Sequence, residues 1–414
     1  RPAAERTVSR EGWKKNSFMK AGTAFCNDKN STSSGKTVAE SALQNGRITR
    51  PDLVIAFCSN RSDPDQFIHG IRSVTGDGVP VIGGSSIGII TNDHLSYEEY
   101  PSAALAVESD RIRVRTAHAG RIDREPEAAG RELAEKLGQQ PDDRLLMLFY
   151  DSVAIEPTET SPPVLTPSSR LLSGIEALLP DMPVAGAGLL GDYHFTPARQ
   201  FLGSHAASKS IAGTVFSGDF SHSCRIMHGC RPLNGIYHTI TRMDEDIIYE
   251  LDGHPVVEMI DQLYGSRHWQ SQCPVNLLTV GVNCGARFAE PEECNYVNRL
   301  ITGVLPDKSG IRLFEPDQAL AEGTEIQFML RDTGKMIESA GENAADLMEQ
   351  IQKNGKQALF ALYIDCAGRT AAQSGTLGEE ADEVREVCNR HDIPLLGFYS
   401  GVEIAPLLNR SRGL

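Results

Sequence analysis

The sequence predicts an α/β fold in which repeated strand–helix–strand units form layered sheets. Two observations lead to this prediction. Apolar, strand-like runs alternate with helical patterns along the chain, which is typical of α/β layering. In addition, an apolar residue, proline, two apolar residues and glycine occur in this order three times, as VPVIG (79–83), MPVAG (182–186) and IPLLG (393–397). A pattern that recurs in the same context indicates a repeated structural unit.

Each predicted unit contains a strand, a loop, a helix and a second strand that ends at a glycine turn. The runs are PDLVIAFCSN, DPDQFIHGIRSV and VPVIGG in the first unit, DDRLLMLFYDSV, SSRLLSGIEALL and MPVAGAGLLGD in the second, and KQALFALYIDCAGR, GEEADEVREVCNRH and IPLLGFYSGVEIAP in the third. Two further alternating runs, joined at Ser109 and Asp110, predict a β-hairpin. Loops that follow successive strands meet at one edge of a sheet, where ligands tend to bind.

The composition argues against several classes of function. The 414 residues include 40 Lys and Arg against 55 Asp and Glu, and the resulting formal charge of −15 repels nucleic acid and anionic lipid. No stretch approaches the ~20 consecutive apolar residues of a membrane span. Nine cysteines without a CxxC pair indicate reduced thiols, so we expect a cytoplasmic protein that binds neither nucleic acid nor membrane.

The chain divides into three predicted regions. Residues 1–36 are polar and end in a run rich in serine and asparagine, which indicates a flexible lead-in. Residues 37–228 hold the first two units and form an N-terminal domain. The pattern changes near residue 229, where a Cys/Pro turn leads into an alternating strand and a helix, so residues 229–414 form a C-terminal domain.

Glycine turns supply the first candidate ligand-binding residues. Gly83 and Gly186 allow the backbone to approach a ligand or a neighbouring strand, and Ser85 and Ser86 offer hydroxyl groups to a ligand beside the first turn. The stretch GSSIG (84–88) also fits the G-x-S-x-G elbow of serine hydrolases. The long helix that should follow such an elbow is missing from the pattern, which favours the glycine turn.

The third unit supplies the remaining candidates. We expect its strand ends to place six residues around one pocket mouth: Asp365, Cys366, Arg369, Tyr399, Ser400 and Glu403. A guanidinium offers a planar fork of donors that matches a carboxylate, so Arg369 is a candidate for binding a carboxylate ligand. An internal ion pair between Arg369 and Asp365 explains the same residues, and the sequence leaves both interpretations open.

The stretch SHSCRIMHGC (221–230) contains two histidines and two cysteines at alternate positions. A strand would place His222, Cys224, His228 and Cys230 on one face, with the outer two about 26 Å apart. The four side chains therefore cannot bind one metal ion. We predict a half-buried strand face here and no metal site.

These residues resemble the FIST family, a two-part module of signalling proteins. The matching pieces are PVIGGSSIGII with SAALAV for the N-terminal half, and GCRPLNGIYHTITRMDEDIIYELDGHPVVEMI, AEGTEIQFMLRD, ALFALYIDCAGR and IPLLGFYSGVEIAP for the C-terminal half. The chain departs from the family's usual ending because Val402 separates Gly401 from Glu403. The resemblance implies a sensor of small ligands, with amino acids as proposed ligands, and assigns residues 37–228 and 229–414 to the two FIST halves.

One bacterial branch of the family resembles haem-binding nitric oxide sensors that act on histidine kinases and cyclic-di-GMP enzymes. The resemblance therefore implies haem b as a cofactor. We expect His94, His194 or His238 to be its axial ligand, because the first two follow equivalent glycine turns and the third begins the C-terminal half.

The leading hypothesis is a soluble sensory protein, not an enzyme, that binds haem with nitric oxide or an amino-acid-like ligand. No kinase or cyclase motif occurs in the chain, so we expect a separate histidine kinase or cyclic-di-GMP enzyme as signalling partner, and we also expect a homodimer. The alternative from another class is a serine or cysteine hydrolase that uses Ser86 or Cys366 as nucleophile.

Overall fold

The first repeated unit occupies the N-terminal part of the fold. In the computed structural model, which describes residues 18–375, 377–407 and 410–413, its elements are β1 (Met19–Asn27), α1 (Ser31–Gly46), β2 (Leu53–Ser59), α2 (Pro64–Thr75), β3 (Val81–Ser86), β4 (Ile89–Thr91), β5 (Leu95–Ser96) and β6 (Pro101–Ser109). Strands β2 and β3 are parallel, with Ala56 opposite Gly83. Strand β6 pairs antiparallel with the other side of β2.

The second unit repeats this arrangement. Its elements are β7 (Ile112–Gly120), α3 (Pro126–Leu137), β8 (Asp143–Asp151), β9 (Val153–Ile155), β10 (Val164–Leu165), α4 (Ser168–Glu176), β11 (Val184–Leu189), β12 (Gln200–Phe201), β13 (Ala206–Ala207) and β14 (Ser210–Gly218). Strands β8 and β11 are parallel, with Leu148 opposite Gly186, and β14 pairs antiparallel with β8. The pairing of β14 with β8 is thus equivalent to that of β6 with β2.

The third unit contains the same parallel pair of strands. Its elements are α6 (Thr333–Lys353), β23 (Ala361–Cys366), α7 (Ala371–Ser374), α8 (Glu380–Arg390), β24 (Leu395–Ser400), β25 (Val402–Leu407) and β26 (Arg410–Gly413). Strands β23 and β24 are parallel, with Tyr363 opposite Gly397. The predicted α/β fold of repeated strand–helix–strand units is therefore confirmed, and each unit also has a helix before its first predicted strand.

The sequence had suggested that the repeated glycine lies in a turn, but it lies inside a strand. A Cβ atom on Gly83 would lie 1.9 Å from the Ala56 carbonyl oxygen, and one on Gly186 would lie 1.9 Å from the Leu148 carbonyl oxygen. Both residues also have positive φ angles, of 128° and 153°. Glycine is needed because the neighbouring parallel strand occupies the space of a side chain.

Short strands link the three units in a closed cycle. After β3, strand β4 of the first unit pairs with β24 of the third. After β24, strand β25 of the third unit pairs with β11 of the second, and after β11, strand β12 of the second unit pairs with β3 of the first. At the centre, Phe57, Phe149 and Phe398, one from each unit, pack against one another with ring centroids 3.9–5.8 Å apart.

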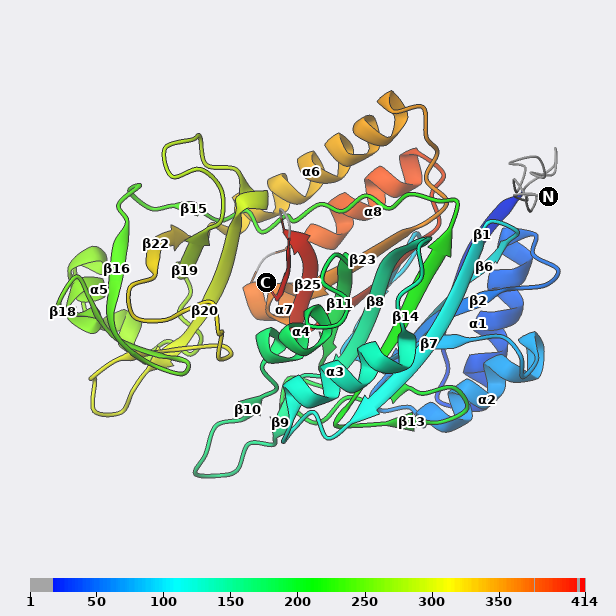
Figure 1. Cartoon of the computed structure of the whole chain (residues 1–414), viewed down its shortest axis with the longest axis horizontal. Coiled ribbons are helices and arrows are strands. Elements are labelled where there is room, and N and C mark those ends of the chain that lie inside the picture. Colours follow the sequence, from blue (N-terminus) through cyan, green and yellow to red (C-terminus); the bar gives the residue numbers. More distant parts are fainter. Residues whose placement is uncertain (1–17, 376, 408–409, 414) are drawn as a thin grey trace, which may run out of the picture.

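The helix pairs α1/α2, α3/α4 and α6/α8 lie around the outside of the three units, as Figure 1 shows. Between the second and third units the chain forms a separate sheet with its own core around Trp269, on the left in Figure 1. Its elements are β15 (Arg231–Pro232), β16 (His238–Asp244), β17 (Ile247–Leu251), β18 (His254–Pro255), α5 (Val256–Tyr264), β19 (Leu278–Asn283), β20 (Tyr296–Val304), β21 (Ile311–Leu313) and β22 (Glu325–Leu330). We call it the inserted sheet.

Three sequence-based expectations need correction. Of the predicted flexible lead-in (1–36), residues 1–17 lie outside the described residues. The remainder is not a flexible segment, because β1 pairs along its whole length with β6, and Asn30 caps α1 by accepting from the Ser33 amide. Strands β6 and β7 form no hairpin, because they belong to different sheets. Residues 220–230 have no regular secondary structure, so they form no strand face. The domain boundary at residue 229 stays a prediction.

Candidate functional site

A cavity of about 2120 Å³ lies where the third unit meets the second unit and the inserted sheet. Two stretches line it without a break, residues 219–228 and 359–369. Its apolar wall includes Leu145, Met147, Phe216, Leu362 and Ile364, and its polar wall includes Arg331, Asp365, Cys366, Arg369 and Glu403. Apolar walls with a few convergent polar groups are typical of a ligand site.

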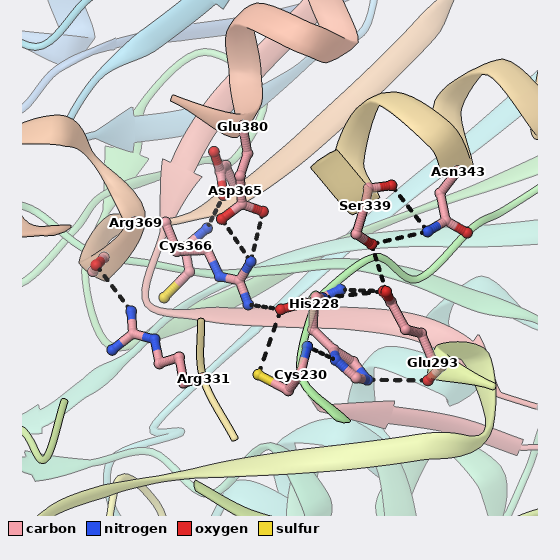
Figure 2. Close-up of polar contacts among 12 residues, drawn as sticks. His228, Cys230, Glu293, Arg331, Ser339, Asn343, Asp365, Cys366, Arg369 and Glu380 are labelled. Atoms are coloured by element: carbon pink, nitrogen blue, oxygen red, sulfur yellow. Dashed lines mark hydrogen bonds and ion pairs between the residues drawn. The ribbon is translucent and has the colours of Figure 1, made fainter. Parts of the chain in front are cut away.

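Groups of the protein bind the guanidinium of Arg369, as Figure 2 shows. Its Nη1 donates to both carboxylate oxygens of Glu380, at 2.7 and 2.6 Å, and its Nη2 donates to the His228 carbonyl at 3.0 Å. Burial alone would lower the pKa of Arg369, but Glu380 raises it well above its usual range, so the guanidinium stays charged. The sequence had left open an internal ion pair of Arg369 with Asp365; an internal ion pair does form, but its partner is Glu380, at the start of α8.

His228 connects this ion pair to the inserted sheet. Glu293 Oε2 accepts from the backbone amides of His228 and Gly229, at 2.9 and 3.1 Å, and Ser339 donates to Oε1 at 2.5 Å. The His228 ring is engaged on both sides, since Nδ1 accepts from the Cys230 amide and Nε2 lies 3.1 Å from the Glu293 carbonyl. Burial lowers the pKa of His228 to about 4, so its ring is neutral near pH 7.

Arg331 is a cavity arginine that uses few of its five N–H donors. It follows β22, and its Nη2 donates to the Gly368 carbonyl at 3.3 Å. No carboxylate in the described part of the chain lies within 4.0 Å of its guanidinium. Burial, together with the charge of Arg369, lowers the pKa of Arg331. Arg331 is therefore a cation that lines the cavity without a carboxylate partner among the described residues.

Two carboxyl groups, those of Asp365 and Glu403, line the same cavity as this arginine. Asp365 is buried; its Oδ1 accepts from the Cys366 amide at 2.9 Å, whereas Oδ2 makes no hydrogen bond of normal geometry within the described residues. Burial, and then Glu380, raise the pKa of Asp365 well above its usual range, although the nearby Tyr363 hydroxyl acts in the opposite direction. Glu403 accepts from the Ser400 hydroxyl at 2.6 Å, and burial raises its pKa to about 7.

Neither proposed hydrolase nucleophile is activated. The Ser86 side chain is fully buried and donates to the Gly88 carbonyl at 2.7 Å. Burial raises the pKa of the Cys366 thiol to about 12, with Glu403 acting in the same direction. Nucleophilic cysteines instead have a lowered pKa, because the thiolate is the reactive form. The geometry gives the hydrolase alternative no support at either residue.

Several predicted ligand residues do not line this cavity. Ser85 bonds through both its amide and its hydroxyl to the backbone of Arg199, and the Tyr399 hydroxyl donates to Glu379. Gly83 and Gly186 pack against neighbouring strands, as described above. The cavity brings together Asp365, Cys366, Arg369, Ser400 and Glu403 of the predicted set.

The three predicted haem ligands do not fit this cavity either. His94 stacks on Phe25, His194 is exposed, and the Nδ1 of His238 lies 2.7 Å from Asp252. Two other histidines, His222 and His228, line the cavity, and both ring nitrogens of His228 are engaged. Among the described residues, no group of three or more His, Cys, Asp or Glu side chains is arranged to hold a metal ion.

Sequence reasoning missed Glu380, Glu293 and Arg331. Arg331 had a readable signal, because it directly follows the apolar run of β22 just as Arg369 follows that of β23. The two carboxylates had no such signal in the sequence. Glu293 belongs to a loop of the inserted sheet, and Glu380 lies in the acidic first turn of a helix, where acidic residues are common.

The chain matches two models of one protein family. The FIST N domain matches residues 52–254 and the FIST C domain matches residues 257–406. The protein therefore belongs to the FIST family, whose domains are sensory domains, as the sequence resemblance predicted. No helix in the described part of the chain combines the length and the apolar character that crossing a membrane requires.

Comparison with solved structures gives weak similarities. One is described as "Cyanuric acid hydrolase: evolutionary innovation by structural concatenation"; it is 11% identical, has a TM-score of 0.27 and covers 51% of this chain and 72% of that chain. Another, a cyanuric acid hydrolase from A. caulinodans, is 11% identical with a TM-score of 0.25, covering 50% and 69%. These values are too low to support an argument about function. Among curated proteins nothing matches the chain.

Proposed function

We propose that this protein is a sensor of a small ligand that carries a carboxylate and a cationic amino group, as amino acids do. The single observation that carries the proposal is Arg331, a cavity-facing guanidinium without a carboxylate partner among the described residues. A ligand carboxylate there would gain charge-assisted hydrogen bonds. Arg369, for which the sequence left a ligand-binding role open, instead forms an ion pair with Glu380.

The acceptors on the polar wall suit the other end of such a ligand. Asp365 has an oxygen without a normal hydrogen bond, and Glu403 lines the same wall. An ammonium group beside them would lower both pKa values, because an opposite charge favours the ionised form of a carboxyl group. Ligand binding would then release protons, and affinity would rise with pH up to the pKa values of the unliganded carboxyl groups.

The signalling output is also part of the proposal. Ligand binding would stabilise one arrangement of the third unit and the inserted sheet, because the cavity wall includes residues of both. A separate histidine kinase or cyclic-di-GMP enzyme in the cytoplasm would bind that arrangement, with the sensor acting as a homodimer.

Isothermal titration calorimetry with a panel of the standard amino acids tests the ligand. Replacing Arg331 by Met should weaken the best-binding amino acid about 10- to 100-fold, the scale of a charge-assisted hydrogen bond. Replacing Arg312 by Gln is the matched control, since Arg312 lines the same cavity but is paired with Asp246. Equal affinity of the Arg331 variant and the native protein would remove Arg331 from the site.

A visible spectrum with added haem and nitric oxide tests the other ligand class. A sharp Soret band that shifts with nitric oxide and is lost on replacing His222 by Ala would replace the amino-acid proposal. His222 is the histidine to test, because it lines the cavity and makes no hydrogen bond through its ring to the described residues.

A further inference from the structure

Strand β23 has an uncovered edge. The four-stranded sheet of the third unit has the order β23-β24-β4-β5, so among the described residues β23 pairs with β24 alone. The equivalent strands of the other units are covered on that side, β2 by β6 and β8 by β14. Ala104 lies opposite Ala56, and Gly213 lies opposite Leu148, but none of the residues that the structure describes pairs with Tyr363 on the other side.

The hydrogen-bonding groups of this edge follow from the register. The Ala361 amide donates to the Pro394 carbonyl at 2.9 Å, just as the Val54 amide donates to Pro80 and the Leu146 amide to Pro183. Ala361, Tyr363 and Asp365 therefore direct their backbone groups toward β24. Because successive residues of a strand alternate, Leu362 and Ile364 direct their amide and carbonyl groups to the uncovered side.

This edge lacks the features that protect other edges. The outermost strands β1 and β7 carry Lys20, and Arg113 with Arg115, which discourage pairing with another chain. Strand β23 reads ALYIDC, without lysine, arginine or proline, and the side chains of Leu362 and Ile364 are half-buried against the central core. A bare apolar edge is suited to pair with a further strand.

The space beside the edge of β23 is large enough for a further strand. The unbroken lining by residues 359–369 includes all of β23, so the cavity runs along the strand. Its volume of about 2120 Å³ exceeds the ~300–1,000 Å³ of ordinary small-molecule pockets, which leaves room for an extended peptide as well as a small ligand.

We infer that the edge of β23 binds an extended, antiparallel segment of a partner polypeptide. The segment would take the place that β6 and β14 hold in the other units, by strand addition. Those strands read PSAALAVES and SIAGTVFSG and carry small residues, Ala104 and Gly213, opposite the centre of β2 and β8. The partner segment is accordingly apolar, uncharged at its centre and rich in alanine, glycine and serine. This inference goes beyond the proposed ligand sensing and does not depend on it.

Two synthetic peptides with the sequences of β6 and β14 serve as probes, measured by fluorescence polarisation against the full chain. Each is made in two N-methylated forms, with either the odd- or the even-numbered amides blocked. A peptide that pairs with one edge directs only every second amide toward that edge. The form in which these amides are methylated should therefore bind at least tenfold more weakly, and the form in which the other amides are methylated should bind like the parent peptide. Hydrogen exchange should show slower exchange of the Leu362 and Ile364 amides when the peptide is bound.

Variants separate this site from the ligand site. Ile364→Pro removes an outward amide while leaving the bonds of Tyr363 and Asp365 to β24, and it should weaken peptide binding at least tenfold. Arg331→Met should leave peptide binding unchanged. If Ile364→Pro does not fold, the pair of methylated peptides decides the question alone. Equal binding of both methylated forms, protection on β1 or β7 instead of β23, or β23-dependent self-association of two copies would each overturn the inference.

Discussion

Strands β8 and β23 are equivalent strands of two units, and each has a buried aspartate at or near its end. The two aspartates differ in the number of backbone amides from which they accept hydrogen bonds. At the end of β8, Asp151 Oδ1 accepts from the amides of Val153 and Ala198, and Oδ2 accepts from the amide of Lys209. Near the end of β23, Asp365 lines the cavity and has one amide partner, and its second oxygen accepts no hydrogen bond of normal geometry from the described residues.

The difference arises from the segments that return over each sheet. In the second unit, residues 198–209 lie between β11 and β14 and bring two of the three amides to Asp151. The third unit has no strand equivalent to β14 among the described residues, so nothing comparable covers Asp365. The same parallel core thus surrounds the aspartate with backbone amides in one unit and leaves it with a single amide partner, beside the cavity, in the other.

The largest expected effect compares the glycines of these two units. Gly186→Ala should destabilise the protein by on the order of 4 kcal/mol or more, because its Cβ would lie 1.9 Å from the Leu148 carbonyl oxygen. Gly397→Ala should cost less, about 1–3 kcal/mol, since the closest atom to its Cβ is 2.9 Å away. Urea unfolding measures both. Gly78→Ala, with open space around its Cβ, is the control, and equal losses for Gly186 and Gly397 would contradict the comparison.

The second prediction compares the two arginines of the polar wall. Arg369→Met should destabilise the fold by about 3–5 kcal/mol, because it leaves the buried carboxylate of Glu380 without a partner. Arg331→Met should change the free energy of unfolding by less than about 1 kcal/mol, since it breaks no ion pair among the described residues. Thermal unfolding of the Arg369→Met/Glu380→Met double variant should show a smaller loss than Arg369→Met alone. A larger loss would mean that the ion pair does more than neutralise Glu380.

The third prediction compares the two aspartates directly. Asp151→Asn should cost about 1–3 kcal/mol at pH 7, because the amide nitrogen of asparagine cannot accept from the backbone amides that surround it. Asp365→Asn should cost less than about 1 kcal/mol, since its nitrogen can occupy the position of Oδ2, where the nearby group is the Tyr363 hydroxyl and not a backbone amide. A hydroxyl can accept from that nitrogen, whereas a backbone amide cannot. Chemical unfolding at pH 7 compares the two variants, and a greater loss for Asp365→Asn would reverse the assignment of closed and open sites.

The smallest effect concerns Glu403 and pH. Burial raises its pKa from 4.5 to about 7, so the folded protein holds this proton more tightly than the unfolded chain. The corresponding stability is fully present below pH 4.5, decreases as the pH rises from 4.5 to about 7, and changes no further above that. Glu403→Gln should remove the part of this decrease that comes from Glu403, because glutamine does not titrate. Melting curves across this range should be less pH-dependent in the variant, and an unchanged slope would assign the decrease to other buried acids.

Local patterns predicted the repeat well and the site only in part. The strands β2, β8 and β23 were readable because each is a run of apolar strand formers, and the glycines were readable because they recur after a proline. Helix α1 was missed because its buried face consists of small residues, such as Ala39 and Ala42, within a polar sequence. The expected hairpin is wrong because β6 pairs with β2 and β7 pairs with β14, in two different sheets.

The sequence by itself determined the α/β class, the three units and the family of this protein, because burial and backbone geometry leave local, periodic marks on a chain. Only the tertiary structure decided that short strands pair one unit with the next and that Glu380 neutralises Arg369 while Arg331 lines the cavity. It also decided that, within the described part of the chain, β23 pairs on one side alone. Those outcomes depend on which distant segments meet, and an arginine or an apolar strand reads the same in a sequence whether or not a partner reaches it.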